Sequence, residues 1–176
     1  ITVVDLDSMM TGLASRHPIL TELNKHAFSH EKVQVLNTDA FNYMEREKQL
    51  YDLIIVDLPD PRSVELNRMY TSEFYRLCQL KLRPHGVLIS QAGSPYFATK
   101  AFRCIDTTMA SAGFETLPLH NHVLTLGEWG WVLGMKENWT KGNLKTKARQ
   151  LSFKDVETKW LNQEAMLMMS SFGKDI

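Results

Sequence analysis

Short apolar runs and longer amphipathic stretches alternate along most of the chain. The runs are rich in Val, Ile and Leu and end at polar residues, which is typical of strands buried in a parallel sheet. The stretches between them carry apolar side chains every three or four positions, the period of an amphipathic helix. The pattern predicts strands at residues 1–7, 32–40, 51–61, 83–95, 114–120 and 129–135. It predicts helices at residues 8–27, 41–50, 69–82, 97–113 and 160–172.

Four residues mark where these predicted elements divide, turn or end. Pro18 is expected to split the first helical stretch into two helices, because proline breaks a helix interior. Gly86 is expected in a turn before the fourth strand, and Gly113 is expected to close a helix. Asn162 is expected to cap the N-terminus of the last helix.

Strands that alternate with helices at this spacing predict an α/β fold with a mostly parallel, doubly wound sheet. We expect the core of this fold at residues 1–136 and a polar linker with a C-terminal helix at residues 137–176. The lysine-rich segment 136–150 is expected to be a solvated loop.

Charge and composition exclude several classes of protein. Lys and Arg total 20 and Asp and Glu total 20, so the basic excess of a nucleic-acid binder is missing. No apolar run approaches the roughly 18 residues that span a bilayer. Cys78 and Cys104 are the two cysteines and lie far apart, so we expect buried reduced thiols of a cytosolic protein and neither a metal site nor a disulfide framework.

Polar side chains follow four consecutive predicted strands. In an open α/β sheet, ligands bind beyond the carboxyl ends of the strands, so these side chains are expected at the ligand-binding edge. One acid after a strand is equally well explained as a turn or a helix cap. Four strands with such ends together favour a site. The residues are Asp5 and Asp7, then Asp39, then Asp57 and Asp60, then Gln91.

The first two of these strands suit an adenosine. A carboxylate at Asp5 can accept hydrogen bonds from both ribose hydroxyls, and Asp39 can accept from the exocyclic amine of adenine. The chain carries no glycine-rich phosphate loop. An adenosine without phosphates, such as a sulfonium nucleoside of the S-adenosylmethionine type, fits this combination.

The two acids of the segment VDLPDP, Asp57 and Asp60, have three common uses. A metal site would need further ligands nearby in sequence, and none is present at ligand spacing. Glycoside hydrolysis fits poorly beside an adenosine site. The third use is to hold a protonated amine and take its proton as it attacks, with Asp57 as base and Asp60 as anchor.

At these residues the chain resembles the spermidine synthase (polyamine aminopropyltransferase) family. The resemblance rests on an ordered set of segments between residues 1 and 135: ITVVDLD, LNTDAFNY, YDLIIVDLPDP, YTSEFY and GVLISQAGSPYF. It implies a Rossmann-like fold of the S-adenosylmethionine-methyltransferase type. It also implies transfer of an aminopropyl group from decarboxylated S-adenosylmethionine, a co-substrate and not a tightly bound cofactor, to a diamine such as putrescine, with release of methylthioadenosine.

The resemblance also implies the site residues. Asp57 matches the family's proposed general base, and Asp60 and Gln91 match residues near the amine. Asp5 matches the acid that binds ribose. Asp39 matches the acid that contacts adenine, with Ala40 where a glycine is common.

Two C-terminal segments, LGEWGWVLG and KWLNQEAMLMMSSFGKDI, resemble the branch of the family that carries a fused membrane-spanning region. The sequence starts inside a strand, so we expect a piece truncated on the N-terminal side that lacks the family's N-terminal hairpin and glycine-rich loop. The resemblance further implies a homodimer. It implies a cytoplasmic location, at the inner face of the membrane if the membrane-spanning region is attached.

Residues near the end of the predicted sheet leave alternatives open. The segment HVLTLGEWGW lacks the tyrosine that soluble members carry, so the acceptor can differ from putrescine. Glu128 and Trp129 can offer an acid and an aromatic face to a cation, or can be a solvated acid beside a core Trp. His120 and His122 share one face of a strand with no evident carboxylate partner, so a metal site is not expected there.

Two other functions remain open at this point. A methyltransferase that uses S-adenosylmethionine itself would need the same nucleoside site. A non-catalytic domain that senses polyamines or nucleosides would need the site but no base.

Overall fold

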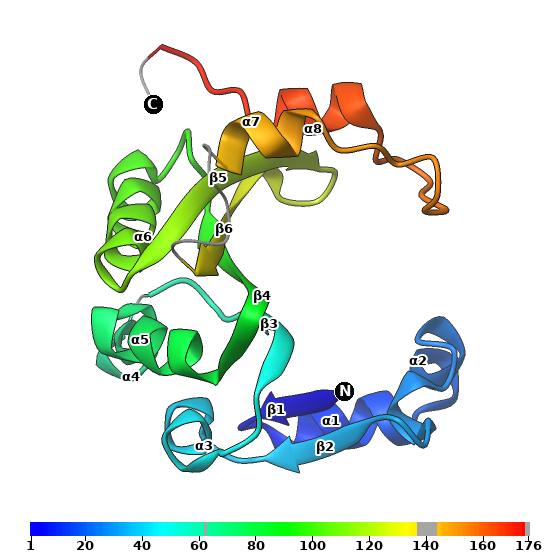
Figure 1. Cartoon of the computed structure of the whole chain (residues 1–176). Coiled ribbons are helices and arrows are strands. Elements are labelled where there is room, and N and C mark those ends of the chain that lie inside the picture. Colours follow the sequence, from blue (N-terminus) through cyan, green and yellow to red (C-terminus); the bar gives the residue numbers. More distant parts are fainter. Residues whose placement is uncertain (62, 137–143, 175–176) are drawn as a thin grey trace. The chain divides into compact units, whose positions relative to one another are not determined.

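The computed structural model describes residues 1–61, 63–136 and 144–174 and divides into two compact units, Ile1–Lys48 and Gln49–Ile176 (Figure 1). Each unit contains strands and helices in alternation, and the predicted α/β class is confirmed. Among the described residues, no helix has the length and apolar character needed to cross a bilayer.

The N-terminal unit is built on two parallel strands, β1 (Thr2–Asp5) and β2 (Gln34–Asn37), which pair Asp5 with Asn37 at their carboxyl ends. The predicted division of the first helical stretch is confirmed, since Pro18 is the first residue of the second helix and needs no backbone N–H there. The helices of this unit are α1 (Ser8–Arg16), α2 (Pro18–Leu23), the 3-10 helix η1 (Ala27–Ser29) and α3 (Ala40–Arg46).

The C-terminal unit contains a four-stranded sheet in the order β3-β4-β6-β5. β3 (Tyr51–Val56) and β4 (Leu82–Gly93) are parallel, whereas β6 (Gly127–Lys136) is antiparallel to both β4 and β5 (Phe114–Val123). The sheet is therefore mixed, because the predicted closing pair of strands forms a hairpin. The helical elements are α4 (Val64–Asn67), η2 (Arg68–Tyr70), α5 (Ser72–Lys81), α6 (Thr99–Ser111), α7 (Leu144–Arg149) and α8 (Gln163–Met169).

Helices cover both faces of the β5–β6 hairpin. On one face α6 packs against the strands, and the Met109 side chain lies against Gly134. On the other face α7 and α8 pack on β5, with the buried residues Leu117, Leu119 and Leu144 in one cluster. Figure 1 shows α6 and α7 on the two sides of these strands. The hairpin that closes the sheet is thus held by helices from both directions.

Three local predictions are refined or corrected by the structure. Gly86 lies inside β4, but residues 83–86 bulge out of the ladder, since Leu82 pairs with Tyr51 and Val87 pairs with Leu53. A Cβ on Gly86 would come 3.0 Å from both Cβ of Leu82 and the carbonyl oxygen of Tyr51, so glycine is needed at this irregularity. Part of segment 136–150 is helical, since Leu144 and Ala148 are buried, while residues 137–143 lie outside the described part. Cys78 is buried as expected, but Cys104 is exposed.

Two predicted helix boundaries are confirmed. Gly113 adopts a φ of +92° just after α6, a conformation that residues with a side chain rarely adopt. The side chain of Asn162 accepts a hydrogen bond from the backbone N–H of Ala165 at 2.8 Å and so caps α8.

Candidate functional site

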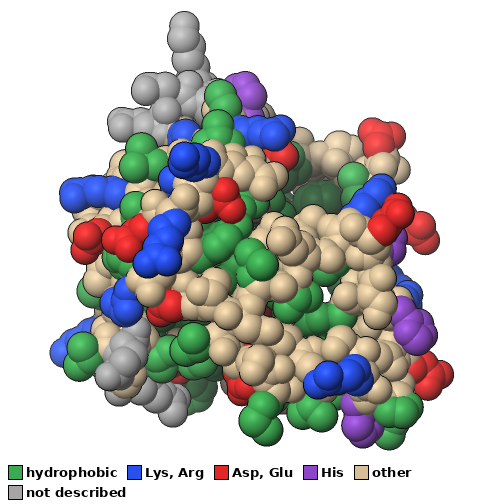
Figure 2. Space-filling view, turned by 90° about the horizontal axis from the view of Figure 1, so that it is seen from below, with side chains coloured by type: hydrophobic (Ala, Val, Ile, Leu, Met, Phe, Trp, Pro, Cys, Tyr) green, Lys and Arg blue, Asp and Glu red, His purple; other side chains and the backbone are tan. Residues whose placement is uncertain are grey.

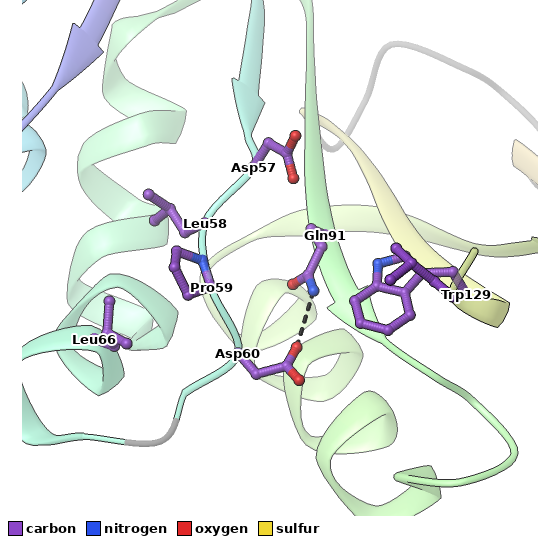
Figure 3. A pocket seen from close by; sticks show the side chains of 8 residues that line it. Asp57, Leu58, Pro59, Asp60, Leu66, Gln91 and Trp129 are labelled. Carbon is purple, nitrogen blue, oxygen red and sulfur yellow. Dashed lines mark hydrogen bonds between the residues drawn. The ribbon is translucent and has the colours of Figure 1, made fainter. Parts of the chain in front are cut away.

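A pocket of about 510 Å³ lies at the carboxyl ends of β3 and β4 in the C-terminal unit (Figure 3). Acidic and amide side chains form one part of its lining, and apolar and aromatic side chains form the rest. The lining residues are Asp57, Leu58, Pro59, Asp60, Leu66, Gln91, Leu126 and Trp129. All three residues predicted for the amine end of the site are among them.

Strand register places these polar residues together. Val56 of β3 pairs with Ser90 of β4 in a parallel ladder, so the next residues, Asp57 and Gln91, lie side by side where this ladder ends. Parallel strands present their carboxyl ends at the same edge, where ligands of open α/β sheets bind. Asp57 and Gln91 are neighbours because β3 and β4 pair, and the apolar runs of the sequence predict both strands.

The two acids in the loop after β3 do not cap the helix that follows. Pro59 and Pro61 have no backbone N–H, and the next helix, α4, begins only at Val64 with Ser63 as its cap. The carboxylate of Asp57 is exposed to the pocket and has no hydrogen-bond partner in the described part of the chain. Asp57 is thus left available to a ligand.

Asp60 is held by its neighbours. Its Oδ1 accepts a hydrogen bond from Nε2 of Gln91 at 2.9 Å, drawn as a dashed line in Figure 3. Gly93, with a φ of +69°, lies behind it, and a Cβ on Gly93 would come 3.4 Å from the same oxygen. Gln91 is buried. The structure therefore holds one oxygen of Asp60 on a buried amide of the neighbouring strand.

Tyr70 is buried, but its hydroxyl belongs to the site. It donates toward three oxygens, each at 3.1 Å: the carbonyls of Leu58 and Pro59 and Oε1 of Gln91. Burial raises the pKa of Tyr70, and the negative charges of Asp60 and Asp57 add to the shift. The one sequence signal for this role is a tyrosine in an apolar stripe, since a buried hydroxyl needs a polar partner.

The β5–β6 hairpin supplies the opposite wall of the pocket. Leu126 and Trp129 line it, and Figure 3 shows the indole of Trp129 across the pocket from Asp57 and Asp60. An aromatic face at this position can attract a cation that the acids also attract. The sequence left Trp129 as either an aromatic face for a cation or a core residue, and the structure supports the first interpretation.

Glu128 contacts histidines and is not among the pocket's lining residues. Its Oε2 lies 3.0 Å from Nδ1 of His120, and its Oε1 lies 3.4 Å from Nδ1 of His122. The expectation that these histidines have no carboxylate partner is wrong, because the hairpin brings residue 128 opposite residue 122. Among the described residues, no group of three or more His, Cys, Asp or Glu side chains is arranged to hold a metal ion.

The predicted nucleoside residues lie in the N-terminal unit and make local contacts there. Oδ1 of Asp5 accepts from the backbone N–H of Asp7 at 2.7 Å, and Asp7 caps α1. Asp39 caps α3 by accepting from the backbone N–H of Asn42 at 2.8 Å, and Ala40 is the first residue of that helix. Asp5 is the last residue of β1 and Asp39 follows β2, so both lie at the carboxyl end of a paired parallel strand.

Surface charges agree with the balanced composition. On the face that Figure 2 shows, acidic and basic side chains are interspersed among apolar ones and do not gather into one basic patch.

Comparison with known proteins identifies the family. The model of the spermine/spermidine synthase domain matches residues 1–146, which include every residue of the pocket. The chain belongs to the spermine/spermidine synthase family. The resemblance of the ordered sequence segments to this family is confirmed.

Relatives within the spermine/spermidine synthase family are much longer than this chain. A polyamine aminopropyltransferase of Leptospira interrogans is 40% identical over 179 residues, which cover 100% of this chain and 34% of the relative. One of Oceanobacillus iheyensis is 38% identical over 175 residues, which cover 99% of this chain and 33% of the relative. The chain thus spans about a third of the length of the curated relatives it matches.

Solved structures of spermidine synthases share the fold. One, in complex with the transition-state analogue AdoDATO, superimposes with a TM-score of 0.78 at 19% identity and covers 98% of this chain and 58% of that chain. The enzyme from Thermotoga maritima gives a TM-score of 0.76 at 20% identity, with 98% and 57% covered. At these identities the likeness supports the Rossmann-like fold.

Proposed function

We propose that the protein to which this chain belongs is a polyamine aminopropyltransferase. It transfers an aminopropyl group from decarboxylated S-adenosylmethionine to a diamine such as putrescine and releases methylthioadenosine. The observation that carries the proposal is the pocket in which Asp57, Asp60 and Gln91 lie together, in a chain of the spermine/spermidine synthase family. Two relatives that match the whole or nearly the whole chain bear the name of this activity.

Asp57 acts as the base in the proposed reaction. A primary amine is mostly protonated at neutral pH, so a carboxylate first attracts it and then accepts its proton. The amine nitrogen forms a bond to the aminopropyl carbon while the bond from that carbon to the sulfonium sulfur breaks. The sulfur leaves as a neutral thioether and needs no acid. The exposed carboxylate of Asp57, with no hydrogen-bond partner in the described part of the chain, suits this role.

Asp60 acts as the anchor for the cationic amine, and Trp129 supports it. A fixed carboxylate favours the charged form of a nearby amine and orients it. The hydrogen bond from Gln91 occupies Oδ1 of Asp60 and orients the carboxylate toward the pocket. Trp129, across the pocket, adds an aromatic face for the methylene chain and its charge. An anchor of this kind contributes by positioning the amine for attack.

Asp5, Asp39 and Ala40 of the N-terminal unit are proposed to bind the nucleoside. A carboxylate has two oxygens that together accept several hydrogen bonds, so the local contacts of these acids are compatible with a further ligand. The assignment of ribose to Asp5 and adenine to Asp39 rests on the match to the family's sequence segments.

The proposal includes the setting of the whole protein. The C-terminal segments support an attached membrane-spanning region, and the family resemblance supports a homodimer located in the cytoplasm or at the inner face of the membrane. Detergent fractionation and light scattering of the full-length protein test these points. Recovery of a monomer from the soluble fraction would contradict both the membrane attachment and the homodimer.

The decisive assay uses the full-length protein with decarboxylated S-adenosylmethionine and a panel of diamines. Chromatography should detect methylthioadenosine and the extended polyamine in equal amounts. Parallel reactions with S-adenosylmethionine should give no methylated product. Methyl transfer would favour the methyltransferase, and binding of amine or nucleoside without any product would favour the sensing domain.

A further inference from the structure

We propose that Tyr70 is a positioning residue for the amine: its hydroxyl holds the side-chain amide of Gln91 so that the NH2 group faces Asp60. This inference rests on the proposed function. It concerns a residue whose apolar surroundings in the sequence predict packing alone. Tyr70 is 8% exposed and Gln91 is 5% exposed, so both side chains are withdrawn from solvent.

The three side chains form one directed chain of hydrogen bonds. Tyr70 donates to Oε1 of Gln91 at 3.1 Å, and Nε2 of Gln91 donates to Oδ1 of Asp60 at 2.9 Å. A glutamine amide has an accepting end and a donating end, whereas an ionised carboxylate only accepts. If the amide were reversed, Oε1 would face the carboxylate of Asp60, and two acceptors would meet. The donor at Tyr70 therefore matches the one orientation that Asp60 allows.

The same hydroxyl also contacts the backbone between the two acids. It lies 3.1 Å from the carbonyl oxygens of both Leu58 and Pro59, which connect Asp57 to Asp60. The hydroxyl has one hydrogen, so these contacts are shared with Gln91. One oxygen atom thus connects the loop that carries both acids to the strand that carries Gln91.

Protonation keeps this hydroxyl a donor. Burial raises the pKa of Tyr70 above its ordinary value of 10.0, and the charges of Asp60 and Asp57 raise it further. The hydroxyl of Tyr70 therefore stays protonated throughout the neutral range. Asp57 and Asp60, which attract the amine, thus also favour the protonated, donating form of the Tyr70 hydroxyl.

Tyr75 provides a matched control. It lies on α5, is 0% exposed, and its hydroxyl is 3.2 Å from Oγ of Ser90, next to Gln91 on β4. Tyr75 does not line the pocket. Tyr75→Phe and Tyr70→Phe each remove one buried hydroxyl, but only Tyr70→Phe breaks the chain that ends at Asp60.

The experiment compares both variants in the full-length protein. Tyr70→Phe should raise the KM for putrescine about tenfold, the size expected for one buried hydrogen bond, and change the KM for decarboxylated S-adenosylmethionine less than about twofold. Tyr75→Phe should leave both KM values within about twofold, because the hydroxyl of Tyr75 contacts Ser90 and is not part of the chain that ends at Asp60. Equal effects of Tyr70→Phe on both substrates, or no effect, would overturn the inference.

Calorimetric binding of putrescine separates this inference from the proposed function. A wild-type protein that binds putrescine but transfers nothing overturns the proposed function alone. In that protein, a tenfold weaker affinity on Tyr70→Phe supports the positioning role, and an unchanged affinity overturns it. A wild-type protein that binds no diamine overturns both.

A second variant keeps the inference testable if Tyr70→Phe does not fold. Gln91→Met removes both the accepting and the donating end of the amide and should raise the KM for putrescine selectively, whereas an unchanged KM would overturn the inference. Where both variants fold, Tyr70→Phe should add little in the Gln91→Met background, because the two residues act through one chain. Multiplicative effects on the KM for putrescine would show that Tyr70 does not act through Gln91.

Discussion

Acids that follow strands have different fates in the two units of this protein. In the N-terminal unit, Asp39 caps the helix that starts at the next residue, and Asp5 accepts from the backbone two residues on. In the C-terminal unit, Asp57 and Asp60 line a pocket, and Asp60 is bound by a side chain from another strand.

The residues that follow each acid account for this difference. A helix N-terminus offers backbone N–H groups that an acid can satisfy at once. Asp39 has such a helix directly after it. Asp57 and Asp60 are followed by prolines, and the next helix is capped by Ser63. An acid after a strand is therefore a stronger candidate for ligand binding when the following residues cannot use it as a cap.

The largest expected effect concerns Asp57. Asp57→Asn in the full-length protein should lower kcat for aminopropyl transfer about 100- to 10,000-fold, the contribution of a general base, and leave the fold intact. Asp52→Asn is the matched control, because Asp52 lies on the same strand, is exposed and pairs with Arg83 at 3.5 Å. Steady-state rates and circular dichroism check both variants, and full activity of Asp57→Asn would end its assignment as base.

Trp129 tests whether the pocket wall contributes to amine binding. Trp129→Ala should raise the KM for putrescine about 2- to 30-fold, because a cation–π contact contributes roughly 0.5 to 2 kcal/mol. Trp160→Ala is a suitable control, since Trp160 is 89% exposed and does not line the pocket. If both substitutions raise the KM equally, the aromatic wall has no specific role.

Asp39 tests the capping side of the comparison. Asp39→Ala should lower the free energy of unfolding by about 1 kcal/mol, whereas Asp39→Asn should change it little, because Asn caps helices as well as Asp does. Urea unfolding followed by circular dichroism measures the difference. Equal losses for both substitutions would mean that the charge, and not the cap, stabilises this position.

The smallest expected effect is on the pKa of Tyr70, which the negative charges of Asp57 and Asp60 raise. The pKa of Tyr70 is raised, so its contribution to stability is complete below its ordinary pKa of 10.0 and is lost as pH rises above it. Asp60→Asn should move one of the five tyrosines to earlier ionisation in absorbance at high pH, and Asp39→Asn should move none. A shift in both variants would point to a general change in the fold.

Apolar runs and their polar ends were sufficient to predict much of the fold and the acidic part of the pocket. The runs before Asp57 and Gln91 predict strands, and their parallel pairing places the two side chains together. The role of Tyr70 could not be predicted, because its hydroxyl meets carbonyls and an amide that come from other elements. The helix at Leu144 was also missed, since its two buried residues are separated by lysines.

Glu128 shows why single side chains near a hairpin are difficult to assign. The sequence offered it to the pocket beside Trp129, but neighbouring residues on a strand face opposite sides. Trp129 lines the pocket, so Glu128 faces away and meets His120 and His122. Because successive side chains alternate along a strand, Glu128 and Trp129 cannot both line the pocket.

The most direct test asks which substrate is bound by Asp57 and Asp60 and which is bound by Asp5 and Asp39. The KM values for putrescine and for decarboxylated S-adenosylmethionine should be measured in the full-length protein for Asp60→Asn and Asp5→Asn. Asp60→Asn should raise mainly the KM for putrescine, and Asp5→Asn should raise mainly the KM for the nucleoside. A rise in the nucleoside KM alone on Asp60→Asn would contradict the assignment of the pocket in the C-terminal unit to the amine.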